Sequence, residues 1–187
     1  MKVLGISGSS NQDGNNEKAI DKILEFIEKR GFETEQVFLS ESNIKCCSDC
    51  NQCRENIECS IDDDMEKVRE KLIDADAIVV SSPVYFGSVS AQLKSLIDRT
   101  RPLRRNGFLL KNKIGAAIAI GDSRNGGQEF TIQQIHNWMH IHGMVVVGDN
   151  SHFGAILQTE IGDDKTGLKT LEDTANKVCD TLELLKK

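Results

Sequence analysis

The chain has 187 residues, of which 39% are hydrophobic and 28% are charged. This length suits one folded domain over residues 1–187, and the composition is too apolar for an intrinsically disordered chain. The net charge of −6 argues against nucleic acid and anionic membrane surfaces as partners, because both attract clustered lysine and arginine.

The chain begins with a short apolar run, residues 1–7, that leads directly into glycines and polar residues. It lacks the longer apolar stretch and the cleavage site of a secretory signal, and no apolar run reaches the length of a membrane span. We therefore expect a cytoplasmic protein. In the cytoplasm thiols stay reduced, so a group of cysteines there serves metals or redox chemistry more often than disulfides.

Strand-like and helical stretches alternate along the chain, which is typical of an α/β fold. Apolar runs such as AIVV and VVV are hydrophobic on both faces, as in a parallel sheet that is covered on both sides. We predict a three-layer sandwich around a five-stranded parallel sheet. The expected strands are residues 3–7, 35–39, 77–82, 113–120 and 144–147, and the expected helices are residues 17–30, 63–74, 90–99, 128–142 and 168–185.

A loop of small and amide residues, GSSNQDGNN at residues 8–16, follows the first strand and opens a helix. Glycines allow sharp turns, hydroxyl and amide groups donate hydrogen bonds, and a helix N-terminus favours an anion. The loop could therefore bind a monophosphate. It is neither a Walker loop nor a G-x-G-x-x-G turn, and a polar turn that simply caps the helix would look much the same.

An irregular stretch at about residues 40–62, after the second strand, contains five of the six cysteines. Four of them have the spacing C-x2-C-x2-C-x5-C, which lets thiolates from one tight loop converge on an iron–sulfur cluster. A zinc site, a redox disulfide and unused thiols remain alternatives, although zinc sites usually join two C-x2-C pairs across a longer separation. Either Cys46 or Cys47 could provide the first ligand, and the spacing favours Cys47.

Two further loops follow the third and fourth strands. Residues 81–88, SSPVYFGS, combine a stiffening proline, two aromatic side chains and a glycine that lets the backbone approach a flat ring. Residues 121–129, GDSRNGGQE, form a flexible loop that could close over the other edge of the ring. In a flavodoxin-like sheet of order 2-1-3-4-5, the loops after strands one and three flank the topological switch point, where ligands bind.

Charged residues near the cysteines are expected to have structural roles. We expect Asp62, Asp63 and Asp64 to cap the following helix, and Asp98, Arg99 and Arg101 to form ion pairs. No side chain in the sequence stands out as a catalytic acid or base.

Four segments resemble the NADPH-dependent FMN reductase superfamily and, within it, the iron–sulfur flavoproteins of anaerobic archaea and bacteria. They are the GSS…GNN loop, the cysteine run with the DDDM that follows it, the segment SPVYFGSVSAQLKSLIDR and the GGQE loop. The resemblance covers nearly the whole chain. It implies a flavodoxin-like fold, FMN, a 4Fe-4S cluster, and a homodimer or homotetramer in which a cluster lies near a neighbouring subunit's flavin.

The resemblance also implies roles for individual residues. It assigns the cluster to Cys47, Cys50, Cys53 and Cys59, and the FMN phosphate to Ser9, Ser10, Asn15 and Asn16. The isoalloxazine ring would be surrounded by Pro83, Val84, Tyr85, Phe86, Gly87, Gly126 and Gly127. Many relatives carry an arginine where this chain has Asn11, so phosphate binding would depend here on neutral donors.

The hypothesis that follows is an FMN-dependent oxidoreductase that passes electrons between a ferredoxin-like carrier and a small-molecule acceptor. Two alternatives remain open. One is an NAD(P)H-dependent FMN or quinone reductase without a functional cluster. The other is an electron carrier or redox sensor that is not an enzyme.

Overall fold

A parallel sheet lies at the centre of the structure, a computed structural model that describes residues 1–185. Its strands are β1 (Lys2–Ser7), β2 (Glu33–Phe38), β3 (Ala77–Pro83), β4 (Ile114–Gly121), β5 (Val145–Val147) and β6 (Ala155–Gln158). Every pairing is parallel, and the order is β2-β1-β3-β4-β5 with β6 also beside β4. The predicted flavodoxin-like order is confirmed.

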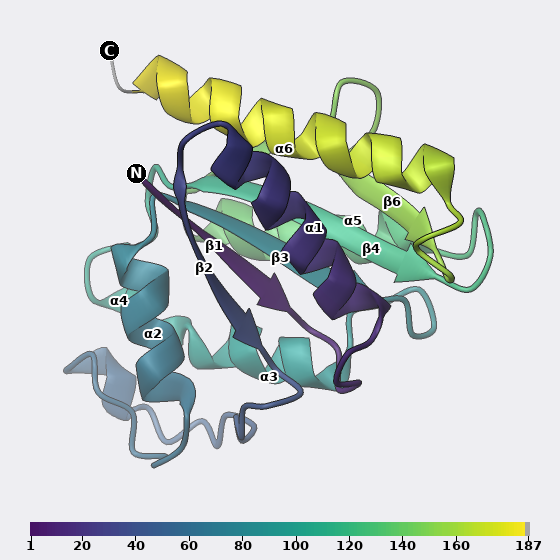
Figure 1. The fold of residues 1–187 in the computed structure, drawn as a ribbon. Helices are drawn as coiled ribbons and strands as arrows, with labels where there is room; N and C mark the ends of the chain where they lie inside the picture. Colours follow the sequence, from purple (N-terminus) through teal and green to yellow (C-terminus); the bar gives the residue numbers. More distant parts are fainter. Residues whose placement is uncertain (186–187) are drawn as a thin grey trace.

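Helices cover both faces of the sheet and complete three layers (Figure 1). α1 (Asn15–Lys29) and α6 (Lys165–Leu185) pack together on one face. The other face carries α2 (Met65–Asp74), α3 (Ala91–Arg99), α4 (Arg101–Arg105) and α5 (Gln128–Ile141). A short 3₁₀ helix, η1 (Gln52–Arg54), lies in the cysteine loop.

The side chains of the sheet alternate between two hydrophobic cores, as the period of a strand requires. In β4, Ile118 and Ile120 belong to the core under α1 and α6, whereas Ala117 and Ala119 belong to the core under α2 to α5. Gly115 has no room for a side chain, because a Cβ there would lie 2.6 Å from Met139 Sδ on α5. Small residues in β4 therefore let α5 lie close to the sheet.

Three short elements were not predicted: β6, α4 and η1. β5 pairs with the first half of β4 and β6 with its second half, so two short strands occupy one position in the sheet. These three elements are too short to show a hydrophobic period, whereas β5, although equally short, is indicated by its three consecutive valines.

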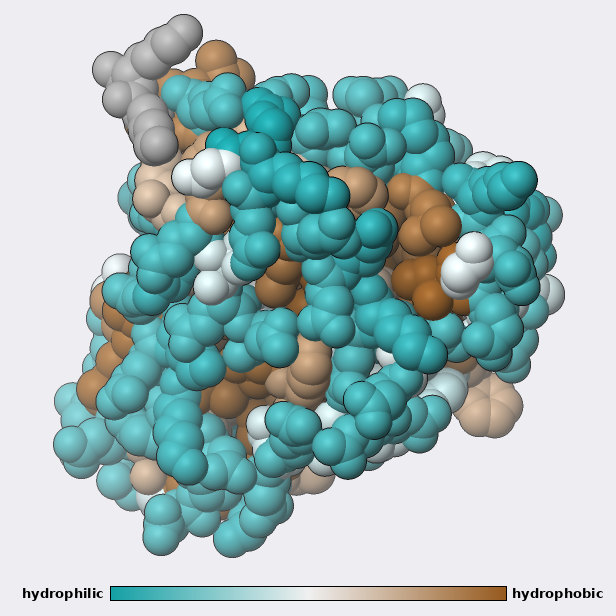
Figure 2. Space-filling model, viewed as in Figure 1, coloured by the Kyte–Doolittle hydropathy of each residue, from teal (hydrophilic) through white to brown (hydrophobic). Residues whose placement is uncertain are grey.

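The surface is largely hydrophilic on the face seen in Figure 2, where hydrophobic residues show through between polar ones. The amphipathic helices explain this pattern, because they turn their apolar sides towards the sheet. Among residues 1–185, no helix combines the length and hydrophobicity needed to cross a bilayer.

Candidate functional site

The three loops that follow β1, β3 and β4 meet at the carboxyl end of the sheet. Gly8 N donates to Ser81 O at 2.7 Å, and Ser90 Oγ donates to Gly8 O, which joins the first loop to the second. Gly127 lies against the second loop, since a Cβ at Gly127 would be 3.1 Å from Gly87 Cα. Loops far apart in sequence thus form one continuous edge.

The first loop brings the four predicted phosphate residues to the start of α1. Ser10 is exposed and Asn15 is half-buried, whereas Ser9 and Asn16 are buried. Ser9 Oγ accepts a hydrogen bond from Asn11 N at 3.0 Å, and Asn16 Oδ1 accepts one from Ser81 Oγ at 2.5 Å. Ser9 and Asn16 therefore also hold the loop in shape, and Ser10 is the most accessible donor of the four.

Glu17 supports this loop, although sequence analysis did not single it out. It occupies the third position of α1, is 3% exposed and accepts a hydrogen bond from Asp13 N at 2.7 Å, and Ser40 Oγ donates to its other oxygen. Gly14, the N-cap, provides no side-chain cap. A glutamate at the third helical position that bonds back to the preceding turn is the sequence signal that could have identified it.

The second loop is a tight turn that presents two aromatic rings. Tyr85 and Ser88 exchange two backbone hydrogen bonds of 3.0 Å, and Phe86 and Gly87 between them have positive φ angles of 53° and 69°. The Phe86 side chain is fully exposed, and Tyr85 is 46% exposed. Gln134 Nε2 on α5 donates to Gly87 O at 3.1 Å and fixes the turn.

Pro83 and Val84 anchor the turn at the end of β3. Pro83 pairs with Ile120 in the sheet, and Val84 N donates to Ile120 O at 2.9 Å. In the third loop, the buried Gln128 accepts a hydrogen bond from Gly126 N at 2.8 Å and donates to Ser123 O at 2.7 Å. All seven residues predicted to surround a ring therefore lie in the second and third loops, which touch.

These features fit FMN. The uncapped N-terminus of a 15-residue helix leaves backbone N–H groups for a phosphate, and exposed aromatic surface stands at the same edge for a flat ring.

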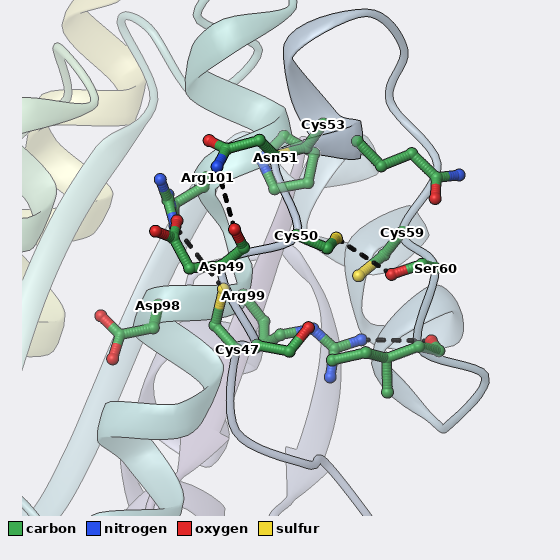
Figure 3. A pocket seen from close by; sticks show the side chains of 14 residues that line it. Cys47, Asp49, Cys50, Asn51, Cys53, Cys59, Ser60, Asp98, Arg99 and Arg101 are labelled. Atoms are coloured by element: carbon green, nitrogen blue, oxygen red, sulfur yellow. Dashed lines mark hydrogen bonds and ion pairs between the residues drawn. The ribbon is translucent and has the colours of Figure 1, made fainter.

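Four cysteines line one cavity beside the C-terminal end of α3 (Figure 3): Cys47, Cys50, Cys53 and Cys59. Cys46 is not among the lining residues. Its Sγ lies 3.3 Å from Ser95 Oγ on α3. The structure therefore separates the two adjacent cysteines and leaves Cys47 with the other three.

A buried ion pair holds both arms of the cysteine loop. The Arg99 guanidinium binds Asp63 at 2.7 and 3.0 Å and also donates to Lys45 O and Ile61 O at 2.9 and 3.3 Å. Burial alone would raise the pKa of the Asp63 carboxyl, but hydrogen bonds from Arg99 and from the N–H groups of Lys45 and Met65 outweigh it and lower this pKa. The bond to Met65 N also helps to cap α2, as predicted for Asp63, whereas Asp64 at the N-cap makes no side-chain cap and accepts a hydrogen bond from Asn43 N instead.

The cavity offers four thiols, the soft ligands that both zinc sites and iron–sulfur clusters use. Among residues 1–185, no three His, Cys, Asp or Glu side chains are arranged to bind a single ion. A tetrahedral zinc needs sulfurs that converge on one point at about 2.3 Å, whereas each cysteine of a four-iron cluster binds a different iron. Ser60 Oγ lies 3.1 Å from Cys50 Sγ, and this hydrogen bond lowers the pKa of the Cys50 thiol, which favours the thiolate that iron binds.

The ring edge and the cysteine cavity lie at opposite ends of α3. Ser90, the N-cap of α3, contacts the first loop, whereas Arg99 at its last turn lines the cavity. Nine helical residues span about 14 Å at 1.5 Å each. The two regions are therefore separate sites that one helix connects.

Comparisons with known proteins find similar sequences over the whole chain. The sequence profile of the NADPH-dependent FMN reductase family matches residues 1–156. An iron-sulfur flavoprotein of Methanosarcina thermophila is 54% identical over 187 residues, covering 100% of this chain and 98% of that protein. Another, from Methanocaldococcus jannaschii, is 47% identical and covers 100% of both chains.

Solved structures agree on the fold. A flavodoxin-type, WrbA-like protein from Agrobacterium tumefaciens superimposes with a TM-score of 0.72 at 17% identity, over 98% of this chain and 97% of that one. At this identity the likeness shows the fold alone.

Proposed function

This chain belongs to the NADPH-dependent FMN reductase family and, within it, to the iron–sulfur flavoproteins, and from this premise we propose how it works as an FMN-dependent oxidoreductase. It passes electrons between a ferredoxin-like one-electron carrier and a small-molecule acceptor, using FMN and a 4Fe-4S cluster. When bound, FMN supplies two-electron and one-electron chemistry, and the cluster supplies one-electron chemistry.

The observation that carries the proposal is the cavity lined by Cys47, Cys50, Cys53 and Cys59. All four are soft thiol ligands on one short loop, and their free state among residues 1–185 leaves each available to iron. Arg99 and Asp63 fix the loop to α3, so the cysteines occupy a defined place relative to the flavin edge.

The chain's own residues bind and orient the flavin. Ser9, Ser10, Asn15 and Asn16 hold the phosphate at the start of α1, together with the N–H groups of its first turn. Tyr85, Phe86 and the backbone at Gly87 contact the ring from the second loop, and Gly126 and Gly127 contact it from the third. No acid or base from the protein is required.

The functional unit is a homodimer or homotetramer in which a cluster lies near the flavin of a neighbouring subunit. Two features support this arrangement: the length of α3 separates the two sites within one chain, and the fully exposed Phe86 gains apolar contacts if a second subunit covers it. The protein acts in the cytoplasm.

The experiment is to purify the protein without oxygen, measure iron, acid-labile sulfide and FMN, and record EPR spectra before and after stepwise reduction. We expect about four irons, four sulfides and one FMN per chain. Cys47→Ser should lose the cluster and Cys46→Ser should keep it. Flavin without iron in the wild type would contradict the proposal.

A second candidate function is an NAD(P)H-dependent FMN or quinone reductase without a cluster. It is favoured by the family profile itself, which is that of an NADPH-dependent reductase and covers most of the chain. Rapid reduction of the flavin by NADPH in Cys47→Ser protein would support it. A pure electron carrier or sensor, in contrast, would show no multiple turnover with any donor and acceptor pair.

A further inference from the structure

Arginine side chains approach the cysteines from one side of the cavity. Arg99 and Arg101 line the cavity, and Arg105, one helical turn beyond Arg101, reaches Cys53 from the end of α4. Arg101 Nη1 lies 3.6 Å from Cys47 Sγ, and Arg105 Nη1 lies 3.0 Å from Cys53 Sγ. Two of the four sulfurs thus have a guanidinium N–H directed at them from the same short helix.

The three arginines differ in how their charge is balanced. Arg99 is paired with the buried Asp63, and Arg101 forms an ion pair of 2.6 Å with Asp49. Arg105 has no ion pair within 4.0 Å in the described part of the chain. Asp98, the other carboxylate at the cavity, is paired with Lys94. Among the arginines at the cysteines, Arg105 is therefore the one without an ion pair within 4.0 Å in the described part of the chain, and its nearest charge partner is the more distant carboxylate of Asp49.

The position of Arg105 is fixed by the chain around it. The next residue, Asn106, donates hydrogen bonds to Cys53 O at 3.3 Å and to Asn56 O at 3.1 Å, and so ties the end of α4 to the loop that carries Cys53. The backbone that carries Arg105 is therefore held beside the loop that carries Cys53.

We infer that Arg105 sets the reduction potential of the cluster by donating an N–H to the Cys53 sulfur, which stabilises the reduced state. The inference rests on the proposed function, because it needs a cluster on Cys53. Reduction adds one electron, supplied by a one-electron reductant, and no bond breaks. The added negative charge spreads onto the cysteine sulfurs, where a cation and a hydrogen bond favour it. Arg105 is a positioning residue, since it acts through Cys53.

The test is the midpoint potential of the cluster in anaerobic protein, titrated with dithionite and followed by EPR. Arg105→Gln should lower the equilibrium constant for reduction about tenfold, which lowers the midpoint potential by about 59 mV for one electron. Arg104→Gln is the matched control, because it removes the same charge from the same helix while its side chain points to Ile141 O and Phe108. That variant should shift the potential much less.

A second comparison separates a hydrogen bond that brings a net positive charge to a sulfur from one that does not. The double variant Asp49→Asn with Arg101→Gln removes a neutral pair beside Cys47, and its potential should stay closer to that of the wild type than the potential of Arg105→Gln does. Should Arg105→Gln bind no cluster, Arg105→Lys is compared with Arg104→Lys. The lysine at position 105 keeps the charge but loses the planar fork, so its potential should fall below that of the control.

The outcomes distinguish a failure of the role of Arg105 from a failure of the proposed function. Equal potentials in the variants at positions 104 and 105, with clusters present in both, overturn the role of Arg105 and leave the proposed function intact. A wild type without iron and sulfide overturns both. A lower potential only when position 105 is changed supports the inference.

Discussion

Asp63 and Arg99 bury opposite charges at the base of the cysteine loop. Their side chains are 0% and 1% exposed, and both arms of the loop depend on them. Asp63→Ala leaves a buried guanidinium without its counter-ion, and we expect it to lower the free energy of unfolding by about 3–5 kcal/mol. Urea unfolding at pH 7 measures this loss, and the iron content of the variant should fall as well.

The neighbouring Asp62 provides the control. It is exposed, and its side chain makes no hydrogen bond in the described structure, so Asp62→Ala should change the unfolding free energy by less than about 0.5 kcal/mol. Equal losses in both variants would show that the ion pair contributes little.

Asn11 offers a way to strengthen flavin binding. It is exposed in the first loop, and its backbone N–H is the donor to Ser9 Oγ. Asn11→Arg adds a positive charge beside the expected phosphate, and because charge-assisted hydrogen bonds are stronger, FMN should bind about tenfold more tightly. Quenching of flavin fluorescence during titration of the apoprotein gives the dissociation constant. Gln12→Arg, on a side chain that bonds to Glu41, should have a smaller effect if position matters.

Contact between the second and third loops depends on Gly127. Its φ is 103°, where side chains are strained, and a Cβ would press on Gly87 Cα and Val84 Cγ1. Gly127→Ala should destabilise the protein by about 1–2 kcal/mol and weaken FMN binding, because the loops must move apart. Gly162→Ala is the control, since a Cβ there meets nothing within 4 Å. Unchanged FMN affinity in Gly127→Ala would contradict a role for this contact.

The sequence predicts elements well where they are long. β3 begins with the apolar run AIVV, β4 contains only apolar residues and glycine, and α1 and α3 have clear polar and apolar sides. The ends of these elements are therefore predicted within about two residues. The short α4 has no such pattern, and yet it carries Arg101 and Arg105 to the cysteines. The contact between Arg105 and Cys53 joins positions 52 residues apart, a relation that only the folded chain reveals.

The candidate sites likewise combine features that are local in the sequence with contacts that only the folded chain creates. The three loops after β1, β3 and β4 and the cysteine spacing are local patterns, whereas the choice between Cys46 and Cys47 depends on where α3 presents Ser95. The ion-pair roles expected for Asp98, Arg99 and Arg101 are confirmed, but spacing could not give their partners Lys94, Asp63 and Asp49.

Two buried histidines make the stability of the whole molecule depend on pH. Burial lowers the pKa of both His136 and His142 to about 4, with smaller effects of His140 and Arg104 respectively. The unfolded chain takes up these protons near pH 6.5, so stability is full above that value and is lost as the pH falls towards 4. The loss is on the order of 3 kcal/mol per histidine.

Urea unfolding at several pH values between 7.5 and 4 measures this dependence. His142→Gln should flatten the curve, because it removes one of the two groups. His140→Gln, on the exposed side of α5, should change the slope much less, because it removes only the smaller effect on His136. Curves of equal slope for both variants and the wild type would contradict the assignment.

The hydrophobic cores do not include the cysteine loop. None of the buried residues in either core lies between positions 46 and 60, and only Ile57 of that segment packs against a core at all. Removing iron with a chelator should therefore leave the far-UV circular dichroism unchanged and lower the urea midpoint only slightly, unlike zinc fingers, which unfold without their metal. Loss of the helical signal on chelation would contradict this view.

A protein whose hydrophobic cores do not include the loop that binds its cluster can keep its fold when the cluster is lost. On this view, loss of the proposed cluster would leave the scaffold in its native shape, with the four free thiols still in place on their loop. Repair then requires only new iron and sulfide, and the polypeptide does not have to be synthesised again.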